Sequence, residues 1–500
     1  MLIDILYLIT LFFYFKKLCY NRAMLNILRK IIPKRFFRAV QPAYHFIMGW
    51  LAALIYGFPS RRLIVIGVTG TAGKTSLVYL LAKVLSAAGY KTGFTSTTIF
   101  SDGDHEWLND KKMTMPGRNF VQKILRRMIK NGCRYAIVET TSEGIKQFRH
   151  RFINYDVAVF TGLYPEHIES HGSFEKYKEA KGRLFHHLKR GRIKYINDDR
   201  VVTKASTGLK RLELARVKKT IVVNGDDPEV EYFLNFWSEA KVVFSLDDQA
   251  QEDRFIKNLA SEARTNDFLL VSGKRVAASA QGTSLQIQDQ VINLQLLGEF
   301  NAMNALAAYA VALNQALAPD LVKAGLEAVK SLAGKLELID AGQNFLVMVD
   351  YSFEPKALTN LYKTIDLLPY RRLIHVLGST GGGRDKARRS ILGRLAGEKA
   401  DIVVVTNEDP YDEDPQQIIG QVAAGAEEAG KQLNLDLFMV PERQDGIKKA
   451  LELAKKDDLV LITGKGAEQA ICVANGRRIA WDDREAARIA IVDKMCVDKK

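Results

Sequence analysis

Short apolar runs and amphipathic stretches alternate along most of this chain. The runs that predict buried strands are rich in β-branched residues and lie at 63–68, 135–138 and 157–160. Apolar residues at helical spacing predict helices near 77–88, 120–130 and 174–188. Because these strands and helices alternate, we expect a mostly parallel sheet with helices on both faces.

A second series of elements begins at residue 345. Its predicted strands lie at 345–349, 373–377, 402–405 and 459–462, and its predicted helices at 355–367, 390–399, 415–430 and 445–455. Between the two series, residues 220–297 are rich in short strands and turns and are expected to form an antiparallel addition, and 301–316 is an Ala-rich helix. We therefore expect an N-terminal segment, 1–60, a central domain, 61–318, and a C-terminal domain, 319–500.

The excess positive charge is concentrated at the beginning of the chain. The formal net charge is +15, and residues 1–100 contain 13 Lys and Arg against one acid, Asp4, which is +12 of that excess. The rest of the chain is nearly balanced, so no nucleic-acid partner is indicated. The four cysteines form no CxxC pair, which favours a reducing compartment over a disulfide framework or a structural zinc site.

The N-terminal segment is apolar as well as basic. Two apolar runs, 2–15 and 43–58, flank a stretch rich in Lys and Arg, and each is shorter than the roughly 20 residues of a spanning helix. Basic residues beside apolar ones suit the anionic cytoplasmic leaflet. We expect a cytoplasmic protein attached to the inner face of the cell membrane through residues 1–58, by one anchor or by interfacial helices. The alternative is that the second run packs against the protein body as a core helix.

A glycine-rich loop, GVTGTAGKTS at 67–76, lies between the first predicted strand and helix. Such loops direct backbone N–H groups toward phosphate oxygens at a helix N-terminus. The residues expected to bind ATP here are Gly70, Thr71, Gly73, Lys74, Thr75 and Ser76. Lys74 would reach the β- and γ-phosphates, and the Thr75 hydroxyl would hold Mg²⁺. Five residues, not the usual four, separate Gly67 from Gly73.

Two side chains are expected at the same edge of the sheet as this loop. Glu139 ends one predicted strand and His167 follows another, and ligands bind beyond the carboxyl ends of parallel strands. Mg²⁺ favours carboxylate oxygen. Taken singly, a structural or solvated role is the commoner explanation for Glu139 and for Lys181 on the helix 174–188, and is as common as a functional one for His167.

Together these motifs resemble the Mur ligase family. The loop has the family's TGTxGKT[ST] form, and VAVFTGLYPEHIESHGSFEKYKEAKGRLF is most similar to the UDP-N-acetylmuramyl-tripeptide synthetases within it. The resemblance implies that Glu139 and His167 bind magnesium and that Lys181 is carbamylated. Addition of CO₂ to a neutral amine would give a carboxylate-like anion that helps to hold a second Mg²⁺.

Further stretches carry the resemblance to the end of the chain. GEFNAMNALAA implies that Asn304 contacts adenine, GKLELI places Lys335 where the family has an arginine, and VDYSFEPKAL implies that Asp350 contacts the ribose. In the last motif Phe353 and Glu354 replace the usual histidine and threonine. On the muramyl-peptide side the matching residues are Thr114, Thr141, Gln147 and Arg149. GSTGGGRDKARR and GKGAE resemble the amino-acid site, which implicates Arg384, Gly464 and Glu468.

Two departures from the family matter. Only about 60 residues precede the loop, so the contacts of the family's separate uridine-binding domain are not carried over. In addition, the DNPR motif that selects meso-diaminopimelate is replaced by Glu408-Asp409-Pro410-Tyr411. Asp409 and Tyr411 are expected in the substrate site, and because tyrosine has no charge to grip a distal carboxylate, lysine or another amino acid is possible.

The resemblance implies an α/β protein with a central P-loop ATPase domain and a C-terminal Rossmann-like domain. Its implied reaction is ATP-dependent addition of an amino acid to a muramyl-peptide carboxylate through an acyl phosphate, in peptidoglycan precursor synthesis. Two alternatives stay open: another amide ligase, of the folylpolyglutamate or cyanophycin type, and a membrane-tethered nucleotide-binding scaffold.

Overall fold

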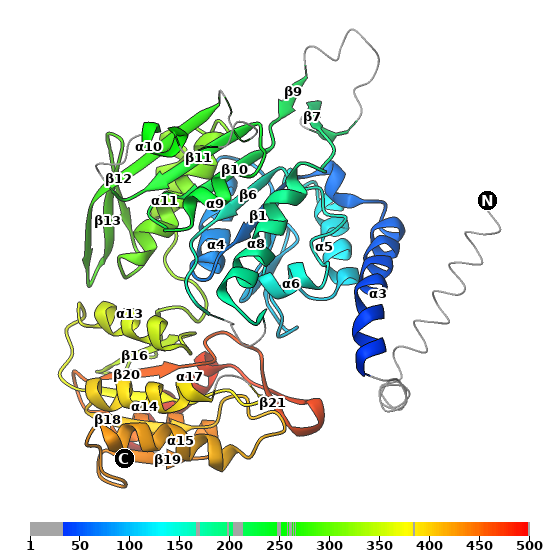
Figure 1. Ribbon diagram of the computed structural model, residues 1–500. Coiled ribbons are helices and arrows are strands. Elements are labelled where there is room, and N and C mark those ends of the chain that lie inside the picture. The colour runs from blue at the N-terminus through cyan, green and yellow to red at the C-terminus, as the bar shows by residue number, and fades with distance from the viewer. Residues whose placement is uncertain are drawn as a thin grey trace.

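The computed structural model describes residues 34–498 except 167–170, 198–199, 204–213, 248–251, 258, 260–262, 264, 266 and 384–385. Within these residues, the first domain is built on an 11-stranded sheet in the order β14-β13-β12-β11-β10-β6-β1-β5-β2-β3-β4 (Figure 1). At its centre β1 (Ile64–Thr69) runs parallel to β5 (Tyr135–Glu139) and β6 (Val157–Phe160). All three strands are fully buried, as their apolar, β-branched sequences predict.

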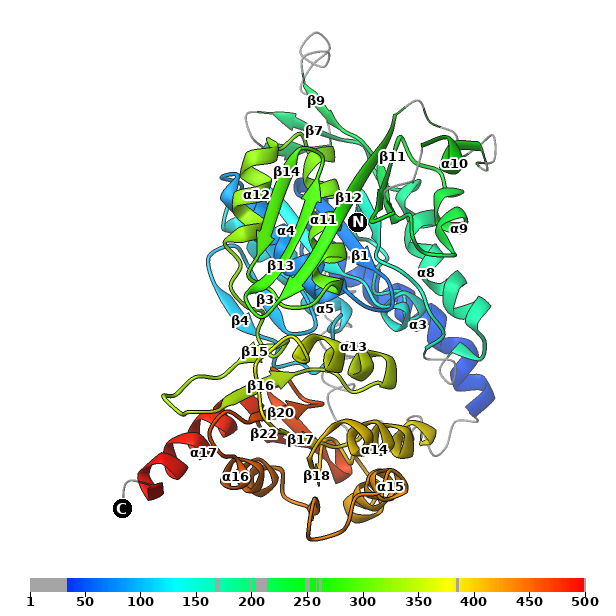
Figure 2. The same ribbon diagram turned by 90° about the vertical axis from the view of Figure 1, so that its left-hand side faces the viewer.

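The sheet continues in both directions from this centre. Beyond β6, the strands β10 (Thr220–Asn224), β11 (Ala240–Ser245) and β12 (Phe268–Ser279) are parallel, and only β13 (Gly282–Ile287) and β14 (Gln290–Leu294) are antiparallel (Figure 2). The expected antiparallel addition over 220–297 is therefore wrong for β10 and β11, and β12 is parallel to β11 and antiparallel only to β13. Beyond β5 lie β2 (Thr92–Thr95), β3 (Ile99–Ser101) and β4 (Glu106–Leu108).

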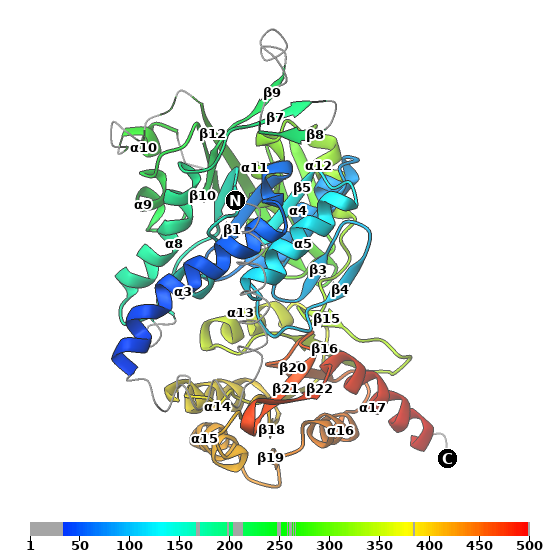
Figure 3. The same cartoon turned by 90° about the vertical axis from the view of Figure 1, so that its right-hand side faces the viewer.

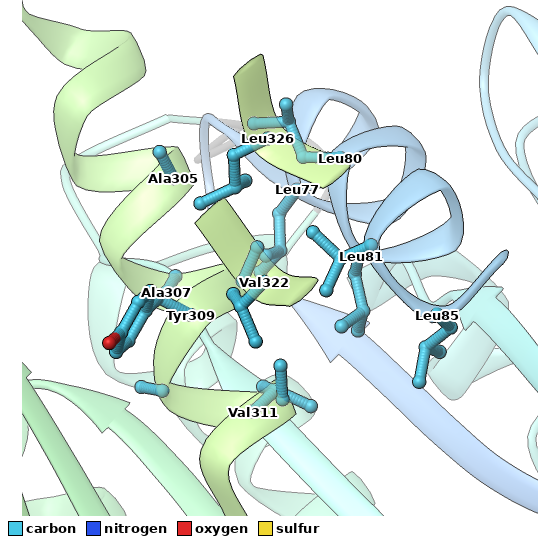
Figure 4. Close-up of a cluster of buried hydrophobic side chains, with 14 of the residues drawn as sticks. Leu77, Leu80, Leu81, Leu85, Ala305, Ala307, Tyr309, Val311, Val322 and Leu326 are labelled. Carbon is cyan, nitrogen blue, oxygen red and sulfur yellow. The ribbon is translucent and has the colours of Figure 1, made fainter. Parts of the chain in front are cut away.

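Helices cover both faces of the sheet. One face carries α4 (Lys74–Ala87), α11 (Phe300–Asn314) and α12 (Pro319–Glu327), and the other carries α5 (Arg118–Lys130) and α8 (Phe174–Leu188). Leu77 and Leu81 of α4 share a buried cluster with Val322 and Leu326 of α12 (Figure 4). Because α12 completes this core, we place the domain boundary at about residue 334, later than the expected 318. The smaller elements of the domain are η1 (Pro59–Arg62), α6 (Ser142–Lys146), β7 (Lys194–Asn197), β8 (Arg200–Val202), β9 (Ala215–Val217), α9 (Val230–Leu234) and α10 (Glu252–Lys257).

The C-terminal domain has a six-stranded sheet among the residues that the structure describes. Its order is β15 (Glu337–Leu338), β16 (Leu346–Asp350), β20 (Leu459–Thr463), β17 (Leu373–Leu377), β18 (Ile402–Thr406) and β19 (Leu437–Val440), and only β15 is antiparallel. The surrounding elements are α13 (Pro355–Ile365), α14 (Ala387–Lys399), α15 (Pro415–Glu428), α16 (Arg443–Leu453), β21 (Ala470–Val473), η4 (Ala474–Gly476), β22 (Arg477–Ala480) and α17 (Asp483–Asp498). The expected Rossmann-like α/β domain is confirmed, although β19 and α17 were not expected from the sequence.

The second apolar run of the N-terminal segment lies on a helix, α3 (Lys34–Ile55), which crosses α5 (Figure 3). Gly49, Ala52 and Ala53 are buried against the domain, so one side of α3 packs as a core helix would. The opposite side exposes large apolar residues, namely Tyr44, Phe46, Ile47, Trp50, Leu54 and Ile55. Over the described residues, no helix is long and apolar enough to cross a membrane. The first run, 2–15, lies outside those residues.

Candidate active site

The glycine-rich loop connects β1 to α4 and is shaped by two glycines. Gly70 and Gly73 have φ values of 153° and 78°, which disfavour residues with a side chain. A Cβ at Gly70 would lie 2.0 Å from Thr161 Oγ1, and one at Gly73 would lie 2.5 Å from Asn304 Oδ1. The sequence therefore needs glycine at both positions, and the loop is packed between β6 and the start of α11.

Two lysines direct their ammonium groups at the carbonyls of this loop. Lys74 Nζ lies 2.6 Å from Thr71 O, and Lys181 Nζ lies 2.6 Å from Gly70 O. Lys181 is on the buried side of α8, one turn after Tyr177, whose hydroxyl lies 3.2 Å from Thr71 Oγ1. Burial, and then the charge of Lys74, lower the pKa of Lys181 far below its usual value.

Glu139 lies beside the loop, as the strand ends predict. It pairs in register with Val68, and it accepts hydrogen bonds at 2.9 Å from Thr75 Oγ1, 2.8 Å from Thr97 N and 2.9 Å from Thr97 Oγ1. Glu139 is buried, and within the described part of the chain these donors are all neutral. A buried carboxylate that only neutral groups contact suits a cation, so Thr75 and Glu139 fit a Mg²⁺ site. His167, the third expected ligand, lies outside the described residues, and no group of three His, Cys, Asp or Glu gathers elsewhere among them.

The other expected nucleotide contacts divide into two groups. Asn304, on α11, lies beside the loop at Gly73, and its expected contact with adenine stays a prediction. Asp350 instead lies where the chain enters the C-terminal domain, and it accepts hydrogen bonds there from Leu336 N at 2.8 Å and Ser352 N at 2.7 Å. Lys335 lies in the same region, with Nζ 5.3 Å from the centre of the Tyr351 ring. Asp350, Lys335 and these partners all belong to the C-terminal domain, and the expected contacts of Asp350 and Lys335 with the nucleotide stay predictions.

The residues expected on the muramyl-peptide side gather only in part. Gln147 Oε1 accepts a hydrogen bond of 2.6 Å from Arg149, and the Gln147 carbonyl accepts one of 2.6 Å from Arg118. Thr141 caps α6 by accepting from Gly144 N at 3.1 Å. Thr114 is linked to this group by its two neighbours, since Arg149 contacts the Met113 sulfur and the Met115 carbonyl, and its own hydroxyl lies 2.8 Å from that of Thr97, beside Glu139.

A cavity of about 180 Å³ lies between the two domains. Its walls include Thr114 from the central domain and Asp409, Tyr411 and Glu468 from the C-terminal domain, so the structure brings these predicted substrate residues together. Gly464 is close by: its φ is 105°, and a Cβ there would lie 2.7 Å from Glu408 Oε2. Arg384 lies outside the described residues.

Two features of the domain interface were not predicted from the sequence. Lys112 Nζ crosses it to lie 2.8 Å from Asp409 Oδ2, 2.5 Å from Glu468 Oε2 and 2.8 Å from Ala470 O. Nothing in the sequence pattern distinguishes Lys112 from its neighbour Lys111, because only the fold brings Lys112 to Asp409 and Glu468.

The second feature is the carboxyl of Glu354. Burial, and then a hydrogen bond with the carboxyl of Glu166, raise the pKa of Glu354 to about 9.

Comparisons with known proteins identify the family of the chain. Models of the Mur ligase middle domain match residues 68–214 and 209–312, and a model of the Mur ligase, glutamate ligase domain matches residues 334–466. A UDP-N-acetylmuramyl-tripeptide synthetase of Roseiflexus sp. is 35% identical, over 89% of this chain and 81% of its own. A UDP-N-acetylmuramoyl-L-alanyl-D-glutamate–2,6-diaminopimelate ligase of Geobacillus kaustophilus is 32% identical, over 89% and 82%.

Similarity to solved structures extends the likeness to the fold. Mycobacterium tuberculosis folylpolyglutamate synthase, solved with ADP and AMPPCP, has a TM-score of 0.59 at 19% identity, over 83% of this chain and 91% of its own. At that identity the match concerns fold alone. With two family models covering more than half of the chain and relatives above 30% identity, the chain belongs to the Mur ligase family of ATP-dependent, amide-bond-forming enzymes.

Proposed function

We propose that this ligase adds an amino acid to the carboxylate of a muramyl-peptide acceptor in peptidoglycan precursor synthesis. The observation that carries the proposal is the placement of two sites in one molecule. The phosphate loop with Glu139 lies at one end of a hydrogen-bonded path, and the interdomain cavity lies at the other, with Thr97 and Thr114 between them. The names of the tripeptide-synthetase relatives supply the substrate class.

The chemistry divides between the two domains. An oxygen of the acceptor carboxylate attacks the γ-phosphorus of ATP, ADP leaves, and an acyl phosphate forms. Lys74 is placed to offset charge on the transferring phosphoryl group, and Mg²⁺ held by Thr75 and Glu139 would supply further neutralisation. The amine of the amino acid then attacks the acyl carbon, phosphate leaves, and the nitrogen loses a proton to give the amide. The C-terminal residues of the cavity would orient that amine.

We also propose that Lys181 is carbamylated in the active enzyme. Carbamylation needs a neutral amine, which attacks CO₂, forms a C–N bond and loses a proton. The lowered pKa of Lys181 supports this, because burial favours the uncharged amine. The resulting anion would lie within reach of Lys74 and add a negative group beside the expected Mg²⁺ site.

The added amino acid is proposed to carry a side-chain ammonium and no distal carboxylate. Asp409 and Glu468 already bind two ammonium groups, those of Lys112 and Lys465, at the cavity wall. A distal carboxylate, as in meso-diaminopimelate, would meet these two acids, and Tyr411 offers no compensating charge. Lysine and ornithine have the required chemistry.

The exposed side of α3 is proposed to rest on an anionic membrane at its cytoplasmic face. Arg61 lies over the ring of Phe58, just beyond the end of α3, and Arg151 lies beside the exposed Phe46. Partial burial followed by repulsion from Arg192 and Arg190 respectively lowers the pKa of Arg61 and Arg151. The Arg151 guanidinium lies 5.7 Å from the ring centre of Phe46 on α3. Clustered arginines next to exposed aromatic and aliphatic side chains complement anionic lipid headgroups over an apolar layer.

An acceptor and amino-acid panel tests the proposed function. The full chain is incubated with ATP, Mg²⁺, a UDP-linked muramyl dipeptide and one amino acid, and products are identified by mass spectrometry while ADP release is followed. We expect lysine or ornithine to give a kcat/KM at least about tenfold above that of meso-diaminopimelate, a difference of about 1.4 kcal/mol. Highest turnover with diaminopimelate would refute the amino-acid assignment. No ADP release with any muramyl acceptor would refute the function itself.

A further inference from the structure

The acid pair at the cavity holds two lysine ammonium groups, and only one belongs to its own domain. Lys465 Nζ, fully buried, lies 2.9 Å from Asp409 Oδ1 and 2.7 Å from Glu468 Oε2. Lys112 Nζ, from the central domain, contacts the remaining Asp409 oxygen and Glu468 Oε2. Within the C-terminal domain, the carboxylates of Asp409 and Glu468 thus face one ammonium group, that of Lys465. They can bind one further cation.

This place, formed by Asp409 Oδ2, Glu468 Oε2 and Ala470 O and called the ammonium site below, suits a primary ammonium group. Its three acceptors lie 2.5–2.8 Å from Lys112 Nζ, matching the three N–H donors of an alkylammonium ion. The Lys112 side chain is only 5% exposed. Burial alone would lower the pKa of Lys112, but Glu468 and Asp409 raise it above its usual value.

The segment that carries Lys112 is held under backbone strain and is joined to the ATP end of the site. Lys112 has a φ of 54°, a left-handed conformation that is unfavourable for a residue with a side chain. Asn109 Nδ2 ties the segment together by donating to Met113 O at 3.1 Å and Thr97 O at 3.0 Å. Two residues after Lys112, Thr114 contacts Thr97, which donates to Glu139.

We propose that Lys112 is an internal occupant of the ammonium site, and that the side-chain ammonium of the incoming amino acid displaces it. The inference rests on the proposed function, since it assumes a diamino acid as substrate. Lys112 and such a substrate present the same group on a flexible aliphatic chain to the same three acceptors. When Lys112 occupies the ammonium site, it links the central domain to the C-terminal domain. When the substrate ammonium occupies the site, the 109–114 segment is released from its strained conformation.

Substitution at Lys112 tests the competition directly. Lys112→Met keeps the aliphatic bulk and removes the ammonium, so binding of L-lysine, measured by calorimetry without acceptor, should tighten by about tenfold, and the KM for lysine should fall while the KM for ATP stays unchanged. Alanine, which has no side-chain ammonium, should gain nothing. The matched control is Lys111→Met, because Lys111 is the neighbouring lysine, exposed and paired only with Asp110. Weaker or unchanged lysine binding in the Lys112 variant would overturn the proposal.

A second measurement uses the unmodified protein. Addition of L-lysine should lower amide hydrogen-exchange protection over residues 109–115, whereas alanine should not. Unchanged or increased protection would overturn the proposal even if the variant failed to fold. Failure of the proposed function has a different signature: lysine would still bind competitively with Lys112 while no muramyl acceptor supported ADP release.

Discussion

At the scale of single residues, the site depends on charged groups held away from water. Lys181 and Glu139 are both almost fully buried, yet each faces the phosphate loop and neither has an oppositely charged hydrogen-bond partner in the described structure. Groups buried in this way are costly to fold and are common where a ligand or a modification supplies the missing charge. Lys74, by contrast, is the first residue of α4, so the start of that helix fixes its position beside the loop.

Replacement of Lys181 tests its proposed carbamate. Lys181→Ala should reduce ligation by at least about 100-fold, since a charge that stabilises the transferring phosphoryl group is lost, and added bicarbonate should not restore it. A carbamate signal from ¹³C-labelled bicarbonate should be present in the unmodified enzyme and absent from the variant. Lys176→Ala, at an exposed position on the same helix, serves as the control. Turnover close to that of the unmodified enzyme would eliminate the carbamate role.

At the scale of elements, α3 has one packed side and one exposed apolar side, whereas the sequence offered core packing and membrane attachment as alternatives. Its small residues Gly49, Ala52 and Ala53 pack against the central domain, while its large apolar residues are exposed, although Phe46 also contacts the ring of Phe152. A helix that only completed a core would not expose tryptophan, isoleucine and phenylalanine together. A helix that only anchored the chain would not need the close packing seen at Gly49.

Vesicle binding tests the exposed side of α3. The full chain should co-sediment with vesicles rich in phosphatidylglycerol, less with phosphatidylcholine alone, and less at high salt because ions screen the arginines. The double substitution Ile47→Glu and Trp50→Glu should reduce binding by about tenfold or more. Leu435→Glu, an exposed leucine of the C-terminal domain, is the control. Equal binding by the double variant would exclude this surface, and a dimer that the double variant abolishes would assign it to a second copy instead.

Much of the element pattern could be predicted because periodicity reports burial. β6, α8 and β17 have the predicted bounds, since each is an uninterrupted pattern with clear ends. The direction of β10 and β11 could not be predicted, because a buried β-branched run looks the same in parallel and antiparallel pairs. Glu139 and Thr75 were found from strand ends and loop spacing. Lys112 was not, because its partners lie about 300 and 356 positions away and meet it only through the domain interface.

At the scale of the whole molecule, both domains contain histidines that are buried in the neutral form. Burial lowers the pKa of His187 to about 4 and that of His375 to about 3, and it lowers the pKa of His150 well below 6.5. His375 lies 2.8 Å from Tyr362 Oη and 3.0 Å from Thr463 Oγ1, inside the C-terminal sheet. The unfolded chain binds protons at these positions below about pH 6.5, whereas the folded chain does not, so stability falls as the pH falls.

Unfolding at several pH values tests this linkage. Between pH 6.5 and 5, His375 alone should reduce the free energy of unfolding of the C-terminal domain by up to about 2 kcal/mol. His375→Gln, which can keep both hydrogen bonds, should remove that part of the slope in urea titrations. His105→Gln, at an exposed position, should leave the slope as it is. Parallel slopes for the two variants would contradict the assignment.

Arg118 lies between α3 and the group of residues expected to hold the acceptor. A Cβ at Gly49 of α3 would lie 3.4 Å from Arg118 Cδ, while the Arg118 guanidinium donates to the Gln147 carbonyl in the group expected to hold the acceptor. A molecule lying on a bilayer by α3 would therefore hold its acceptor group close to that bilayer. Its encounters with a membrane-bound acceptor would be a search in two dimensions, and its rate would follow the surface density of acceptor rather than the bulk concentration.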